Sequence, residues 1–361
     1  MVHASPESIS RARSTLVKAL YLKRVKRLLS SEPGTVLSQL EEIRHALCQF
    51  PNIRVLVVAN VEKIHNPVTS WDLLVSGLDT SKPLAPLDTR LSRLSKAGTN
   101  LGGLSYIIPL PTIDSSYCLS VAKGPETLQD PRVPALMVAV SFLDAVEGPL
   151  WTAVRGTGLA YGTSFSRQIE SGQISFDVYR SPDAFKAFAT SRKVVEDFVS
   201  GATPFDSLAL EGAISSIVLG FASGQATMNS AAQGNFIRQV IRGLPNDWND
   251  VILKEVRGVS VDEIIKVMKE VLLPAFQPET ANVFVTCAPI MEEVSCSGFC
   301  SQVDNSLLTI HRISSKDSKA WDSTPKSKPS RSSRITTASK GTMGMSTWRM
   351  TTISMDRTGM R

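Results

Sequence analysis

Between Leu104 and Cys287 the chain alternates short apolar runs with longer amphipathic segments, and this alternation limits the fold more than any other feature. The short runs have the length and composition of strands, whereas the longer segments have helical spacing and helix-capping residues. Strands are predicted at 104–110, 116–123, 174–178 and 282–286, and helices at 130–146, 181–201, 207–220, 229–243 and 260–273. Elements in this order predict an α+β fold in which helices cover a mixed or antiparallel sheet.

The first hundred residues contain fewer strand signals. Leu37–Cys48 is predicted to be a helix, and the apolar run Ile53–Ala59 has the character of a buried strand. The stretch 66–103 is rich in Pro, Ser, Thr and Gly and is typical of a connection. This part of the chain lacks enough strands to close a sheet of its own.

Charge is distributed unevenly along the chain. The net charge is +6, but residues 314–361 hold ten Lys and Arg against three Asp, which leaves 29 basic and 30 acidic residues in 1–313. The body is therefore close to neutral, and no nucleic-acid partner is expected for it. No run of 18 apolar residues occurs, so no membrane-spanning helix is expected.

The segment 314–361 has few apolar anchors and no periodicity, which predicts a disordered basic tail. Its methionines are unusual for such a tail; they are Met343, Met345, Met350, Met355 and Met360. One hypothesis is a frame-shift artefact, in which an acidic tract is translated in the wrong frame, since GAT and GAC repeats shifted by one base encode Met and Thr. The other is a genuine basic arm that binds anionic partners.

Residues 8–30 carry seven Lys and Arg and no acidic residue, with leucine and valine at near-helical spacing. Such a start is typical of a mitochondrial transit peptide or of a surface helix with a solvated charged face. The same periodicity continues to Leu40 and Ile43, which favours the surface helix.

The residues of a complete catalytic site are missing from the sequence. The histidines (His3, His45, His65 and His311) lie more than five positions apart, which excludes the zinc signatures H-E-x-x-H and H-x-x-E-H. Five scattered cysteines suit reduced thiols, and the spacing of Cys296 and Cys300 alone is a weak zinc signal. We therefore expect no metal and no cofactor in this chain.

One glycine-rich stretch, V-R-G-T-G-L-A-Y-G at 154–162, carries the candidate site. It follows a predicted helix and leads into a strand, which is the reverse of a dinucleotide-binding loop. Gly156, Gly158 and Gly162 allow positive φ or close backbone approach where the chain bends.

Arg155 offers a fork of donors for a carboxylate or carbonyl, and Tyr161 offers a hydroxyl for a developing oxyanion. On an extended strand the two residues would be about 20 Å apart, and a bend at the glycines brings them closer. The alternative without function is an arginine in a surface ion pair and a tyrosine packed at a sheet edge.

Three segments carry a resemblance to a known family. The segment G-P-L-W-T-A-V-R-G-T-G-L-A-Y-G from Gly148 resembles the C-terminal half of the pitrilysin/insulysin zinc metallopeptidases, and is most similar to the presequence-protease branch and its divergent fungal members. The segments G-Q-I-S-F-D-V-Y-R-S-P-D-A from Gly172 and L-L-P-A-F-Q-P-E-T-A-N-V-F-V-T-C-A-P from Leu272 follow in the same order. The resemblance extends from Val17 to Ile310.

In that family, four α+β rolls, two-layer sandwiches of the LuxS-like metallopeptidase type, form two halves around a chamber. The first roll holds the zinc motif H-x-x-E-H, and the last contributes an arginine and a tyrosine that hydrogen-bond the substrate near the scissile carbonyl. The resemblance implies that Arg155 and Tyr161 are these substrate-binding residues. The zinc ligands and the catalytic glutamate of the family match nothing in this chain.

The resemblance also implies a domain organisation. Residues 1–98 would be the end of a preceding roll plus a linker, 99–290 a complete C-terminal roll, 291–313 a C-terminal extension strand and 314–361 the basic tail. Candidates for the extension strand are the pair Gly298–Phe299 and the run Val303–Ile310. The basic N-terminal helix would be interior to a longer protein, so a cytoplasmic location is expected, with the mitochondrial matrix as the alternative.

Two classes of function stay open. In the first, the chain is the non-catalytic, substrate-binding C-terminal portion of a zinc metalloendopeptidase that acts on peptides or unfolded segments; its partners are a peptide substrate and the missing N-terminal catalytic half. In the second, it is a stand-alone binding or scaffold protein of the same fold, like the processing-peptidase and core proteins of mitochondrial complexes. An upstream reading frame with H-x-x-E-H favours the first class, and a promoter directly before Met1 favours the second.

Overall fold

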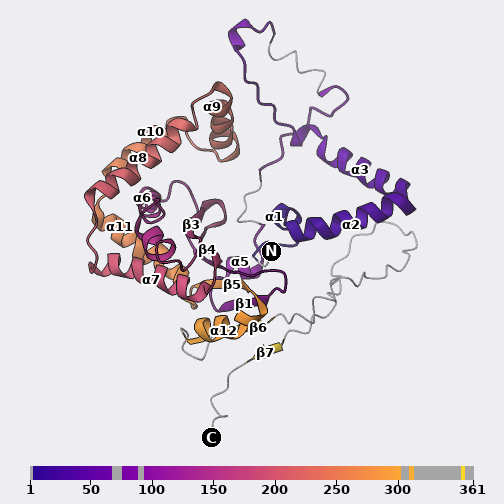
Figure 1. The fold of residues 1–361 in the computed structure, drawn as a ribbon. Coiled ribbons are helices and arrows are strands. Elements are labelled where there is room, and N and C mark those ends of the chain that lie inside the picture. Colours follow the sequence, from indigo (N-terminus) through magenta and orange to yellow (C-terminus); the bar gives the residue numbers. More distant parts are fainter. Residues whose placement is uncertain (1–2, 67–74, 88–92, 302–308, 313–350, 354–361) are drawn as a thin grey trace. The chain divides into compact units, whose positions relative to one another are not determined.

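The structure is a computed structural model that describes residues 3–66, 75–87, 93–301, 309–312 and 351–353 (Figure 1). The chain forms two compact units, one of Met1–Asn100 with Glu211–Val259 and one of Leu101–Leu210 with Ser260–Arg361. In this division Glu211–Val259, inside the predicted roll 99–290, belongs to the first unit. The domain limits 1–98, 99–290, 291–313 and 314–361 stay predictions, and the tail lies outside the described residues except for 351–353.

The first unit is helical in the residues described. The basic N-terminal segment forms α2 (Thr15–Ser31), which contacts α3 (Pro33–Leu47), and both helices are predicted by the leucine spacing. Its other α-helices are α1 (Ile9–Ala12), α5 (Lys96–Thr99), most of α8 (Ser207–Ser223), α9 (Met228–Asn235), which runs on into the π-helix η7 (Phe236–Ile241), and α10 (Trp248–Gly258).

The strand predicted at Ile53–Ala59 is not formed. These residues are irregular in the structure, and Val55, Leu56 and Val58 are exposed. A strand needs a neighbour to bond its backbone N–H and C=O groups, and the described part of the first unit contains only an isolated bridge between Ala4 and Leu94. The prediction of a buried strand at Ile53–Ala59 is therefore wrong.

The second unit contains one mixed sheet. Among the described residues its strands are β1 (Leu104–Pro109), β2 (Ser116–Lys123), β3 (Gly162–Gln168), β4 (Gln173–Ser181), β5 (Ala281–Cys287), β6 (Thr309–Arg312) and β7 (Thr351–Ile353), in the order β3-β4-β2-β5-β1-β6-β7. The strand β1 pairs parallel with β5 and β6, and the other pairs are antiparallel. Together with the covering helices, this confirms the predicted α+β class with a mixed sheet covered by helices.

Helices pack on one face of this sheet, here called the core face. They are α6 (Val133–Leu143), α7 (Ala184–Ser200), α11 (Val261–Val267) with its continuations η8 (Met268–Leu272) and η9 (Leu273–Phe276), and α12 (Glu292–Ser301). Figure 1 shows α7 running beside the sheet. The core is a cluster of phenylalanine rings: the centroid of Phe176 lies 4.9 Å from Phe165, 4.7 Å from Phe276 and 6.0 Å from Phe188.

The helix ends follow the sequence signals. Asp183 caps α7 by accepting from two backbone N–H groups, and Gly201 closes it with φ +77°. Ser260 and Glu263 form the predicted capping box at the start of α11. One terminal expectation was wrong: Gly298 and Phe299 lie in α12 rather than in a strand, where Phe299 packs 5.3 Å from Phe188. The apolar face of α12 is therefore buried against α7.

The face opposite the helices is here called the second face. Since side chains alternate along a strand, Tyr179 of β4 lies on this face, whereas Phe176 and Val178 lie on the core face. Tyr117 of β2 also lies there, next to the shift in register between β2 and β4. Ser175 on the same face is buried, so the exposed part of the second face near β4 is the end that carries Tyr179.

Asp144, which ends α6, bonds to the outermost strand β3. Its Oδ2 accepts a hydrogen bond from the backbone N–H of Phe165 at 2.9 Å, and no hydrogen-bond partner of Oδ1 is found among the described residues. Burial raises the pKa of Asp144 to about 7, although the Phe165 N–H and the nearby Arg167 act in the opposite direction. This carboxyl group is therefore held in the protonated form more readily than an exposed aspartate.

Among the described residues, no single helix is long and apolar enough to cross a membrane. One bent pair meets that criterion only when both helices are counted together: α8 (Ser207–Ser223) and the segment Met228–Ile241.

Candidate functional site

The candidate site begins in a π-helix. Trp151–Arg155 forms η5, in which Val154 is completely buried while Arg155 is exposed. The sequence predicted a helix ending near Gly148 and a strand ahead, and it did not indicate this extra turn. Wide π-turns are frequent at functional sites, because they displace one side chain relative to a regular helix. Here the turn places Arg155 at its last position.

At two of the glycines in this stretch, the backbone leaves no room for a Cβ or has a conformation that favours glycine. A Cβ on Gly156 would lie 2.6 Å from the carbonyl oxygen of Thr152, so only glycine fits against the preceding turn. Gly158 has φ +77°, in the left-handed region that favours glycine. A Cβ on Gly162 would meet nothing within 4 Å. The bend between helix and strand therefore depends on Gly156 and Gly158.

This bend brings the two predicted substrate-binding side chains together. The guanidinium carbon of Arg155 lies 4.5 Å from the ring centre of Tyr161 and 6.0 Å from that of Trp151. Cation and ring at this distance attract each other electrostatically. Tyr161 is 58% exposed, so the pair is accessible to a ligand. The expectation that the glycine bend shortens the separation is confirmed, although Arg155 lies in a helical turn rather than on a strand.

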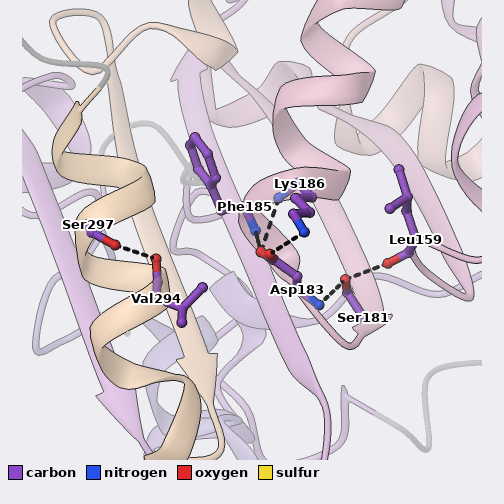
Figure 2. A network of polar contacts seen from close by, with 7 residues as sticks. All are labelled: Leu159, Ser181, Asp183, Phe185, Lys186, Val294 and Ser297. Atoms are coloured by element: carbon purple, nitrogen blue, oxygen red, sulfur yellow. Dashed lines mark hydrogen bonds and ion pairs between the residues drawn. The ribbon is translucent and has the colours of Figure 1, made fainter.

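Backbone and side-chain bonds fix the loop that carries Tyr161. The N–H of Tyr161 donates to the carbonyl oxygen of Arg180 at 2.9 Å. Ser181, completely buried, donates through Oγ to the carbonyl oxygen of Leu159 at 2.6 Å and accepts from the N–H of Asp183 at 3.0 Å (Figure 2). The end of β4 therefore holds the loop on both sides of Ala160, and Tyr161 is positioned by the sheet.

Two further tyrosines extend the site. The ring of Tyr179 meets that of Tyr161 edge-on at 6.0 Å, and the ring of Tyr117 meets Tyr179 edge-on at 5.5 Å. Sequence reasoning did not single out either residue. The alternation in F-D-V-Y at 176–179 carried the signal, because it places Tyr179 on the face opposite Phe176 and Val178.

The two arginines at the site, Arg155 and Arg180, form no ion pair with a carboxylate within the described part of the chain. Arg180 is exposed and has φ +50°, an unusual backbone conformation for a residue with a side chain. The structural alternative of Arg155 in a surface ion pair therefore does not hold among these residues. The site can donate hydrogen bonds to carbonyl or carboxylate oxygens.

A metal centre is not formed by the residues described. No group of three or more His, Cys, Asp or Glu is placed to hold a metal ion in that part of the chain. Of the cysteines whose side chains are described, Cys118 and Cys287 are buried and Cys48 is exposed, all as free thiols.

Comparison with known proteins finds relatives of greater length. No family model matches the chain. An uncharacterized protein of Saccharomyces cerevisiae is 27% identical over 74% of this chain and 27% of its own length. An uncharacterized protein of Schizosaccharomyces pombe is 24% identical over 87% of this chain and 31% of its own length. The chain therefore spans about a quarter to a third of the length of the curated relatives it matches.

Solved structures whose backbone fold is similar to part of this chain include proteases. A protease from Helicobacter pylori is 13% identical with a TM-score of 0.49, covering 62% of this chain and 53% of that chain. The inactive domain of a peptidase M16 from Pseudomonas fluorescens is 15% identical with a TM-score of 0.45, covering 60% of this chain and 48% of that one.

Proposed function

We propose that this chain is the non-catalytic, substrate-binding C-terminal portion of a zinc metalloendopeptidase that acts on peptides or unfolded segments. One observation carries the proposal: the exposed pair in which Arg155 lies 4.5 Å from the ring of Tyr161. These residues occupy the positions that the resemblance to the pitrilysin/insulysin family assigns to substrate binding. Their role here is to hold a peptide and to donate to its carbonyl oxygen.

The chemistry of the pair fits this role. A guanidinium donates several hydrogen bonds in a fixed plane, and a phenol can donate one more. Contact with the Tyr161 ring orients the Arg155 guanidinium before a ligand arrives, which lowers the entropy lost on binding. Ser181 and Arg180 fix the loop that carries the tyrosine. A preorganised donor pair of this kind stabilises an oxygen that gains negative charge.

Cleavage would require a second component. The described residues place no metal-binding group in this chain, and the water that attacks a peptide carbonyl in zinc peptidases is activated by the metal. We propose that the catalytic residues lie in an N-terminal half that pairs with this portion, and that both act in the cytoplasm. The greater length of the fungal relatives is consistent with this arrangement.

Binding of an unfolded protein by the purified chain tests the proposal directly. Fluorescein-labelled casein serves as the unfolded probe, and its anisotropy is followed during titration with the chain. We expect binding that weakens at least about tenfold in a chain with both Arg155→Gln and Tyr161→Phe, because two ligand donors are removed. Equal affinity of the parent and this variant would overturn the proposal. The charge-matched control is Lys123→Gln at the far end of β2.

A further inference from the structure

The Arg155–Tyr161 pair is one end of a longer arrangement. Arg155, Tyr161, Tyr179 and Tyr117 form a series in which each side chain contacts the next, at 4.5, 6.0 and 5.5 Å between guanidinium carbon or ring centres. We call these four residues the cation–tyrosine row. It leads from the π-helix η5 to the end of β4 and on to the start of β2.

The row is open to a ligand at its middle. Tyr179 is 52% exposed and Tyr161 is 58% exposed. The cross-strand partner of Tyr179 on β3 is Gly162, where a Cβ would have no atom within 4 Å. The absence of a side chain there leaves the surface beside the Tyr179 ring free.

The spacing of the row matches an extended peptide. Such a chain advances about 3.3 Å per residue and turns every second side chain to the same side, so side chains at i and i+2 are about 6.6 Å apart. The ring spacings of 6.0 and 5.5 Å in the row are close to this repeat. A peptide laid along the row would therefore present every second side chain to it.

The positive charge at the Arg155 end of the row determines which peptide side chains it can bind. Arg155 has no carboxylate partner among the described residues, and the same holds for Arg180, whose carbonyl oxygen binds the Tyr161 N–H. An acidic side chain would complement this end of the row. The exposed ring of Tyr179 and the half-buried ring of Tyr117 beside it favour an aromatic ring, which packs edge-on or offset against them.

We propose that the cation–tyrosine row binds an extended peptide segment in which an acidic residue and an aromatic residue are about four positions apart, because Arg155 and the Tyr179–Tyr117 pair are separated by two to three steps of the row. The carboxylate lies on Arg155, and the aromatic ring lies on Tyr179 and Tyr117. This inference rests on the proposed function, because it specifies which unfolded segments the same site prefers.

Four fluorescein-labelled peptides test the preference with the full 361-residue chain. The first is Ala-Phe-Ala-Ala-Ala-Glu-Ala-Ala-Ala-Phe-Ala, which reads the same in both chain directions and places a Phe about four positions from Glu on either side. The others replace Glu by Gln, both Phe by Ala, or all three together. Anisotropy titrations then give two ratios: the preference for Glu over Gln and the preference for Phe over Ala.

The two ratios should depend on different residues. We expect each preference to be about tenfold in the parent chain, the scale of one charge-assisted hydrogen bond or one buried ring contact. Arg155→Gln should remove the Glu preference and leave the Phe preference. Tyr179→Ala or Tyr117→Ala should remove the Phe preference and leave the Glu preference, whereas Tyr179→Phe should keep both.

Tyr21→Ala is the matched control, because Tyr21 is 53% exposed on α2 of the other unit. Equal weakening of all four peptides by Tyr179→Ala would overturn the inference, because it would mean that Tyr179 only supports Tyr161. If the Phe preference is absent while the Arg155 and Tyr161 substitutions still weaken casein binding, the inference fails and the proposed function stands. If neither casein nor any peptide binds, both fail.

Discussion

The hydroxyl of Ser181 donates to the carbonyl oxygen of Leu159 at 2.6 Å and thereby joins the end of β4 to the loop that carries Tyr161. The two residues are 22 positions apart in sequence, so this bond is a tertiary one. Because Ser181 is completely buried, the bond lies where water cannot replace it.

Ser181→Ala should lower the free energy of unfolding by about 1–3 kcal/mol, because it leaves the Leu159 carbonyl and the Asp183 N–H without their partner. Urea unfolding followed by circular dichroism measures the change. The control is Ser200→Ala, since Ser200 is exposed and bonds only within its own helix end. Equal stability of the two variants would contradict the role given to Ser181.

Tyr161→Phe should slow peptide cleavage when the complementary catalytic half is supplied in trans. Loss of one donor to a developing oxyanion raises the barrier by about 2–4 kcal/mol. The measurement is kcat with a fluorogenic peptide, and Tyr21→Phe is the control. An unchanged kcat would leave Tyr161 with a structural role.

The purified chain should contain no stoichiometric zinc. The described residues place no three ligands together, and the histidines are too far apart in sequence for a short zinc motif. Elemental analysis after dialysis against a weak chelator measures the metal content. One tightly held equivalent of zinc would show that the ligand assignment is wrong.

Asp144→Asn should change how stability depends on pH. The folded-state pKa of Asp144 is raised from 3.8 to about 7, so between these values the folded protein holds the proton that the unfolded chain releases. The contribution of Asp144 to stability therefore falls as the pH rises through this window, by at most about 4 kcal/mol. Asn stays neutral, so the variant should gain stability relative to the parent as the pH rises.

Urea unfolding of both proteins at about pH 5 and about pH 8 tests this difference. An offset between parent and variant that is the same at both pH values would mean that Asp144 does not titrate in this window.

Gly158→Ala should destabilise the loop before β3. Gly158 has φ +77°, and a residue with a Cβ pays about 1–2 kcal/mol to adopt the left-handed region. Gly162→Ala is the matched control, since its Cβ would meet no atom within 4 Å. The two variants are compared by urea unfolding, and an equal loss in both would remove the special role of Gly158.

Local patterns were sufficient for several elements of the sheet unit, although not for the π-turn Trp151–Arg155 or for α12. The alternation in Ser116–Lys123 predicted β2 with the bounds found, and Gly201 closes α7 as its position indicates. These features depend on residues near each other in sequence. The run Ile53–Ala59 failed because a strand also depends on a distant partner, which a local pattern cannot supply.

The site was only partly predictable for the same reason. The glycines and the types of the two side chains pointed to Arg155 and Tyr161, and the bend between them followed from the glycines. The π-turn at Trp151–Arg155 has no simple sequence signature, and the contact of Tyr179 with Tyr117 depends on the register between β4 and β2. Substrate binding by these residues stays a prediction.

Asp144 also occupies a backbone donor on the outermost strand of the sheet. The strand β3 stands at one end of the strand order, and an outermost strand with unpaired N–H groups is a template for aggregation. The N–H of Phe165, in the middle of β3, is already bonded to Asp144. A strand arriving from another molecule would have to displace a buried carboxyl group to reach this donor. The group whose contribution to stability falls as the pH rises thus occupies a hydrogen-bond donor in the middle of this outermost strand.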